Sequence, residues 1–73
     1  MTRRFYVTRS GRSYFVKENN VVLAYDRPSS RWITTSWNEK DLQRAYPGRL
    51  NEVSSPDEFI FYAREAYYAQ QHP

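Results

Sequence analysis

Short runs of β-branched and aromatic residues in the first half of the chain are separated by polar residues, which is the pattern of β-strands joined by turns. Two pairs of turn residues, Ser10-Gly11 and Asn19-Asn20, separate the first three runs. Glycine and asparagine both tolerate the left-handed backbone that a tight hairpin turn requires. The stretches around these turns predict strands over residues 4–8, 13–17 and 21–26, with a fourth over residues 31–35. The sequence therefore predicts an antiparallel β-meander of three or four strands over residues 3–35.

The two turns also determine which residues face one another. If each turn is a two-residue loop, Tyr6 lies opposite Phe15, and Phe15 lies opposite Ala24. Because side chains alternate across a strand, one face of the sheet gathers Phe5, Val7, Tyr14, Val16, Leu23 and Tyr25. The other face gathers Arg4, Tyr6, Phe15, Lys17, Val22 and Ala24. We expect the first face to be the core.

The second half of the chain has the start signals of two helices. Ser36 and Glu39 match a capping box, which predicts a helix over residues 37–46. A serine, a proline and two acidic residues then predict a second helix over residues 56–70. We expect residues 47–55 to form a loop. In the second helix five residues recur at helical spacing and predict a stripe that packs on the sheet: Phe59, Tyr62, Ala63, Ala66 and Tyr67.

These elements predict an α+β fold, with the β-meander followed by a short helix and a C-terminal helix packed on the sheet. A length of 73 residues leaves room for one core, so we expect a single domain over residues 1–73. A three-stranded sheet backed by one helix is similar in outline to the DNA-binding modules of phage integrases and plant AP2 factors. This chain departs from them by a helix and a loop inserted before the last helix, and it carries no sequence motif of those families.

The composition argues against an enzyme. The chain has no cysteine, and its single histidine is His72, so a His/Cys metal site is excluded. Glycine-rich phosphate loops and nucleotide fingerprints are absent, because the two glycines both lie in turns. We therefore expect a non-enzymatic protein without metal or cofactor. The longest apolar run, residues 21–25, is too short for export or for spanning a membrane, so we expect a cytoplasmic protein.

Charge is divided unevenly between the two halves of the chain. Residues 1–35 carry seven basic and two acidic residues, a balance of +5, whereas residues 36–73 have a balance of −2. Arginine and aromatic residues dominate the energy of protein interfaces, and basic aromatic surfaces also bind nucleic acids. The predicted partner-binding site is the basic first hairpin, with Arg3, Arg4, Tyr6, Arg9, Arg12, Phe15 and Lys17.

Three features of this hairpin bear on the prediction that it binds a partner. Arg9 and Arg12 flank the predicted turn, so both should project from the tip. Arg4 and Lys17 lie nearly opposite each other, and such like charges destabilise a hairpin unless an anion balances them. That anion could belong to a partner or to the acidic helices of this molecule. The helix over residues 37–46 could also cover Tyr6 and make a second core.

The leading hypothesis is a small protein that occupies the surface of a partner protein. Size and composition suggest a phage- or plasmid-encoded inhibitor of a host nucleic-acid-handling complex, of the anti-CRISPR kind. The alternative is a nucleic-acid-binding module that uses the same hairpin on phosphates, although a net charge of only +3 counts against it. Phe61 and Tyr68 share a helical face and would suit an oligomer contact if exposed, but we expect the loop over residues 47–55 to bury them.

Overall fold

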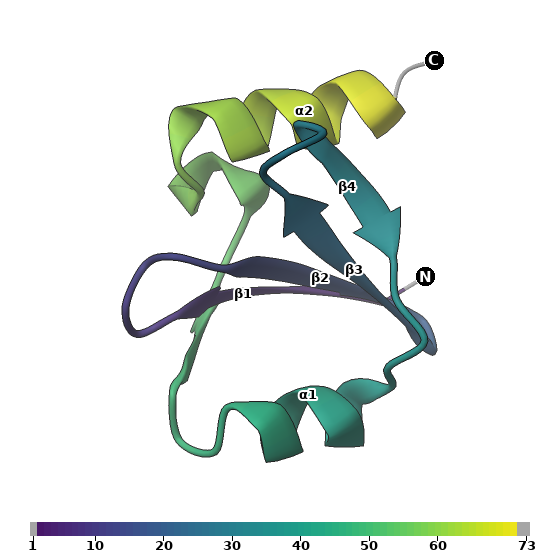
Figure 1. Ribbon diagram of the computed structural model, residues 1–73, viewed down its shortest axis with the longest axis vertical. Coiled ribbons are helices and arrows are strands. Elements are labelled where there is room, and N and C mark those ends of the chain that lie inside the picture. The colour runs from purple at the N-terminus through teal and green to yellow at the C-terminus, as the bar shows by residue number, and fades with distance from the viewer. Residues whose placement is uncertain (1, 72–73) are drawn as a thin grey trace.

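The computed structural model describes residues 2–71, and its α+β fold places a sheet between two helices (Figure 1). The strands are β1 Arg3–Thr8, β2 Tyr14–Glu18, β3 Val21–Asp26, β4 Arg31–Thr34 and β5 Leu50–Val53. The helices are α1 Glu39–Ala45, the 3-10 helix η1 Pro56–Glu58 and α2 Phe61–Gln71. As drawn, α1 lies below the sheet and α2 above it, so each face of the sheet has its own helix.

The predicted register of both hairpins is confirmed. Tyr6 lies opposite Phe15 in the β1–β2 pair, and Phe15 lies opposite Ala24 in the β2–β3 pair. The first connection is longer than the predicted two residues, because the Thr8 amide donates to the Ser13 carbonyl at 3.0 Å and four residues lie between them. We name this connection the tip loop, residues 9–12; its register is unchanged because the loop is centred on the same two residues.

A fifth strand lies where a loop was expected. The sheet order is β4-β3-β2-β1-β5 and every neighbouring pair is antiparallel, so β5 adds to β1 at the edge. The expectation of a structureless segment over residues 47–55 was therefore wrong. Asn51 and Glu52 have low β-propensity, and this strand of four residues forms because β1 offers it a free edge.

The short helix begins later than its predicted start. Asn38, rather than Ser36, is the N-cap: its side chain accepts from the Asp41 amide at 2.9 Å, and the Asp41 carboxylate accepts from the Asn38 amide at 3.0 Å. The capping box is thus present two residues further along the chain. This shift frees Glu39 from capping, so its carboxylate contacts the sheet.

The predicted second helix is divided in two. Ser55 caps only the 3-10 helix η1, where its hydroxyl accepts from the Asp57 amide at 3.2 Å. Phe59 follows in an extended conformation and is buried, which ends η1 before α2 begins at Phe61. The expected helix over residues 56–70 is therefore corrected to η1 and α2, because burial of Phe59 overrides continuous helix formation.

Both faces of the sheet are packed. The core under α2 contains Tyr14, Val16, Trp32, Phe59, Ala63 and Tyr67, with Phe5, Val7, Leu23, Tyr25, Val53 and Ala66 around them. The core under α1 contains Tyr6, Phe15, Val22 and Leu42, with Ala24, Tyr46 and Leu50 around them. The expected core face is thus one of two. The alternative in which the short helix covers the second face is the arrangement observed.

Candidate functional site

The structure separates the aromatic residues of the predicted site from its basic residues. Tyr6 is only 4% exposed and Phe15 only 5% exposed, because both pack under helix α1. The Tyr6 hydroxyl donates to the Glu39 carboxylate at 3.1 Å, so its polar end is satisfied within the protein. These two rings therefore hold α1 on the sheet and present no surface to a partner.

Two basic residues of the predicted site are balanced inside the molecule. The Glu39 carboxylate lies 2.9 Å from the Lys17 ammonium and 3.4 Å from the Arg4 guanidinium. The hydrogen bond from Lys17 is the main reason that the pKa of Glu39 is lowered. Arg3 is balanced in the same way by Glu18, at 3.0 Å. The like charges on the hairpin are therefore tolerated because acidic residues of the same chain face them.

The tip loop keeps its arginines at the surface. Arg9 and Arg12 are both exposed, as the turn position predicted. The Arg9 amide donates to the Arg49 carbonyl at 2.8 Å, which brings the residue before β5 alongside the tip loop. The loop that connects α1 to β5 thus adds a third exposed arginine to the same end of the sheet.

Arg27, in the loop between β3 and β4, joins this group from the other side. Its guanidinium donates to the Arg12 carbonyl at 2.7 Å and to the Tyr62 hydroxyl. The same guanidinium lies 5.8 Å from the centroid of the Tyr14 ring and 5.6 Å from that of Tyr62. Such contacts with ring faces and a carbonyl fix its position, so Arg27 ties the tip loop to the start of helix α2.

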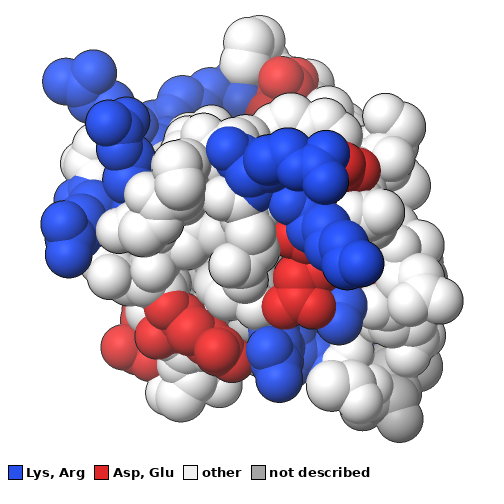
Figure 2. All heavy atoms as spheres, turned by 90° about the horizontal axis from the view of Figure 1, so that it is seen from below, with Lys and Arg blue, Asp and Glu red and all other residues white. Residues whose placement is uncertain are grey.

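We call the group formed by Arg9, Arg12, Arg27 and Arg49 the arginine end. Within residues 2–71 none of its members forms an ion pair, whereas Arg3, Arg4, Lys17 and Arg64 do. Arg31, Lys40 and Arg44 are also without an ion pair there, so the arginine end is distinguished by the convergence of its members from three loops. Asp26 ends β3 next to the β3–β4 loop, but its carboxylate accepts from the amide and hydroxyl of Ser29. Figure 2, seen from the α1 side, shows basic side chains gathered at the left, the end where the tip loop lies in Figure 1.

The sequence pattern missed Arg27 and Arg49 as members of this site. Both follow or lie within turns, as Arg9 and Arg12 do, and that shared position was the available signal. Their convergence depends on the sheet order, because β5 must add beside β1 to bring Arg49 to the tip loop. A residue pattern without β5 could not place them together.

Several apolar side chains of α2 and the residue before it are exposed. Phe61 is 64% exposed, and Ile60, Tyr62 and Tyr68 are between 36% and 44% exposed. The expected burial of Phe61, Tyr62 and Tyr68 was therefore wrong, because η1 turns the helix so that Ala63 and Tyr67 face the sheet. Phe61 instead carries the Arg64 guanidinium 5.2 Å from its ring centroid.

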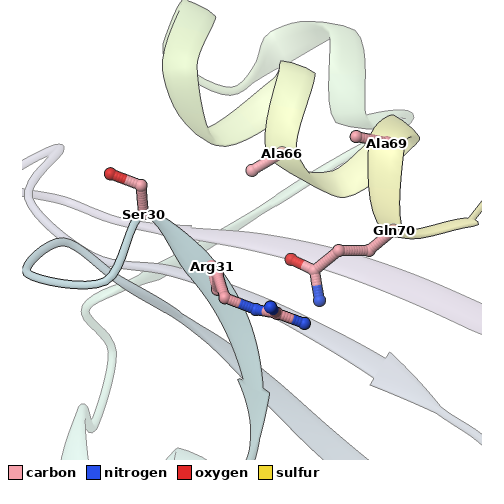
Figure 3. Close-up of a pocket in the computed structure, with 5 residues that line it drawn as sticks. All are labelled: Ser30, Arg31, Ala66, Ala69 and Gln70. Atoms are coloured by element: carbon pink, nitrogen blue, oxygen red, sulfur yellow. The ribbon is translucent and has the colours of Figure 1, made fainter.

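An open groove of about 420 Å³ runs between β4 and α2 (Figure 3). Its lining residues are Ser30, Arg31, Ala66, Ala69 and Gln70. The Gln70 side chain points from the helix toward β4, where its amide is fully engaged with the backbone of Trp32. Arg31 is the only ionisable residue of the lining, so the groove holds no acid–base pair.

Other site chemistry is absent from the part of the chain that the structure describes. No group of three histidine, cysteine or acidic residues there is arranged to hold a metal ion, and no helix there is long and apolar enough to cross a membrane. His72 lies outside the described residues. Comparison with protein-family models, curated proteins and solved structures finds no match to this chain.

Proposed function

We propose that this chain is a non-enzymatic protein that binds an acidic surface of a partner protein through the arginine end. The observation that carries the proposal is the convergence of four arginines from three loops without an ion pair within residues 2–71. Clustered like charges raise the free energy of the isolated protein, and an opposite charge on a partner relieves this repulsion. Arginine is also enriched among the residues that dominate interface energies.

A protein surface suits this end better than a nucleic acid does. Proteins that bind single strands stack bases on exposed aromatic rings, but in the first hairpin Tyr6 and Phe15 are buried under α1, and Tyr14 is buried under α2. Of the exposed rings at this end, Tyr62 already engages Arg27, and Phe61 lies against the Arg64 guanidinium. Ile60 and Phe61 extend this end with apolar surface, and a mixture of arginine and apolar side chains is typical of protein interfaces.

The test combines recovery of a partner with charge reversal. The tagged protein is incubated with native lysate, with and without nuclease, and affinity for the protein that co-purifies is measured by titration. We expect Arg9→Glu with Arg12→Glu to weaken binding at least about tenfold, because both guanidinium groups would become repulsive. The control is Lys40→Glu with Arg44→Glu, which changes the net charge equally on α1. Equal affinity of the two double variants would overturn the proposal.

The nuclease arm decides between the two classes of partner. A partner protein that still co-purifies after nuclease treatment supports protein binding. If co-purification is lost after nuclease treatment, the arginine end binds nucleic acid instead. In that case the affinity should fall steeply with salt, by about one log–log slope unit per phosphate contact. The narrower hypothesis of an inhibitor of the anti-CRISPR kind rests on size and composition and stays a prediction.

A further inference from the structure

The two outer strands of the sheet differ in whether a side chain of the protein hydrogen-bonds their outward backbone groups. β4 and β5 are the outer strands, and an outer strand presents backbone N–H and C=O groups that can pair with another chain. On β4 the Trp32 amide donates to the Gln70 side chain at 2.7 Å, and the Gln70 amide nitrogen donates to the Trp32 carbonyl at 3.0 Å. Gln70 therefore occupies the place that another strand would take at Trp32.

The hydrogen-bond alternation of an antiparallel pair shows which groups of β5 point outward. The Arg9 amide donates to the Arg49 carbonyl, so Arg9 and Arg49 are a hydrogen-bonded pair. Bonded and non-bonded pairs alternate along such strands. Asn51 is therefore bonded to β1, as is Val53, whereas the backbone groups of Leu50 and Glu52 point away from it.

The outward groups of β5 have no hydrogen-bond partner within residues 2–71. Among residues 2–71, no side chain donates to or accepts from the backbone of Leu50 or Glu52. The side chain of Glu52 is exposed, and Leu50 packs into the core under α1. Two N–H groups and two C=O groups thus remain open along this edge, which is the spacing that one added strand requires.

The two ends of this edge carry opposite charges. Arg49 directly precedes β5, and the exposed Arg9 lies beside it in the tip loop. Glu52 lies near the opposite end of the strand. An extended segment with acidic residues next to Arg49 gains attraction at that end, whereas acidic residues next to Glu52 would be repelled.

We propose that an extended, acidic segment of the partner protein adds to β5 as a sixth strand. Its backbone pairs with Leu50 and Glu52, and its acidic residues lie beside Arg49, with Arg9 one strand further into the sheet. Strand addition supplies affinity through main-chain hydrogen bonds, and the arginines select acidic sequences. This inference rests on the proposed function and names the shape of the acidic surface that the arginine end recognises.

The test uses a synthetic peptide of about ten residues in which alternating valines and threonines, a composition that favours strands, are followed by glutamates at the C-terminal end. In antiparallel pairing, which all other strands of the sheet use, this end lies beside Arg49. Amide hydrogen exchange is measured by NMR with and without the peptide. In the free protein, the amides of Leu50 and Glu52 should exchange fast and those of Asn51 and Val53 slowly. We expect the bound peptide to slow the first pair by at least about tenfold. The same peptide with alternate backbone nitrogens methylated should not bind.

Two substitutions at one position separate backbone pairing from charge. Glu52→Pro removes an outward N–H that β1 does not use, so the fold should persist and peptide binding should be lost. Glu52→Ala keeps that N–H and removes the negative charge, so binding should be retained or strengthened. Equal binding by the two variants would overturn strand addition.

The remaining outcomes are also decisive. A peptide that perturbs the resonances of Arg9 and Arg49 but leaves Leu50 and Glu52 unprotected would overturn strand addition and leave the proposed function standing. Without peptide, protection of the Leu50 and Glu52 amides could increase with protein concentration. That result would show that a second copy of the chain pairs with this edge, and it would overturn the proposal of an acidic partner segment. No peptide binding at all would overturn strand addition, and the charge-reversal titration would then decide the proposed function by itself.

Discussion

The carboxylate of Glu39 lies 2.9 Å from the ammonium group of Lys17, and this ion pair joins helix α1 to the sheet. Arg4, which faces Lys17 across the β1–β2 pair, contacts the same carboxylate at 3.4 Å. The Tyr6 hydroxyl donates to it at 3.1 Å. One acidic residue at the start of a helix therefore balances two opposed cations and one buried hydroxyl, whereas no member of the arginine end forms an ion pair within residues 2–71.

Replacement of Glu39 by glutamine should destabilise the protein. The variant keeps the size of the side chain but removes the charge that Lys17 and Arg4 face. We expect a loss of about 1 kcal/mol in the free energy of unfolding, since the carboxylate is only partly exposed and has three partners. Urea unfolding followed by circular dichroism measures it. Glu65→Gln is the control, because that side chain is more than half exposed, and equal losses would contradict a special role for Glu39.

Acidic pH should remove the contribution of Glu39. Its pKa in the folded protein is lowered, first by the hydrogen bond from Lys17, so the folded state favours the ionised form. The stabilisation is present above the unfolded pKa of about 4.3 and is lost as the pH falls through the folded pKa. The stability difference between the wild type and Glu39→Gln should therefore shrink below about pH 4. A difference that is constant across this range would contradict the prediction.

At high pH the relevant group is Tyr67. Burial raises the pKa of its hydroxyl to about 12, since the ring packs between the sheet and α2 with 2% exposure. A raised tyrosine pKa means that the folded state favours the neutral form, so stability is present below about pH 10 and is lost as the pH rises from there. Tyr67→Phe should show a smaller alkaline loss in urea unfolding, by up to about 2 kcal/mol. Tyr62→Phe, at an exposed position, is the control and should retain the wild-type loss.

Local signals explain which parts of the fold could be predicted. The hairpin register follows from alternation and turn residues, and both lie within a few positions of the strands that they determine. The start of α1 could not be decided in this way, because Ser36 and Asn38 can both cap a helix. In the structure the Thr35 hydroxyl donates to the Val22 carbonyl and accepts from the Trp37 amide, so Ser36 lies within a turn.

Non-local contacts explain what could not be predicted. The strand β5 gains its hydrogen bonds from β1, more than forty positions earlier in the chain, and of its own four residues only Val53 has a high β-propensity. Because the sequence predicted a loop in place of β5, it could not place Arg49 beside Arg9, and the predicted site was confined to one hairpin. Burial of Tyr6 likewise depends on where α1 packs, which the residue pattern left open between two alternatives.

The contact between Ala63 and Trp32 offers a sharp test of the α2 core. Ala63 is fully buried, and its carbonyl accepts from the Trp32 indole nitrogen at 2.9 Å, so helix and strand approach closely at this point. Ala63→Leu should destabilise the protein by about 1–3 kcal/mol, because the added carbons have no space between them. Ala69→Leu, at an exposed position on the same helix, should change stability by no more than about 0.5 kcal/mol. Thermal and urea unfolding of the two variants provide the comparison, and an equal effect at both positions would show that α2 is not packed on the sheet through Ala63.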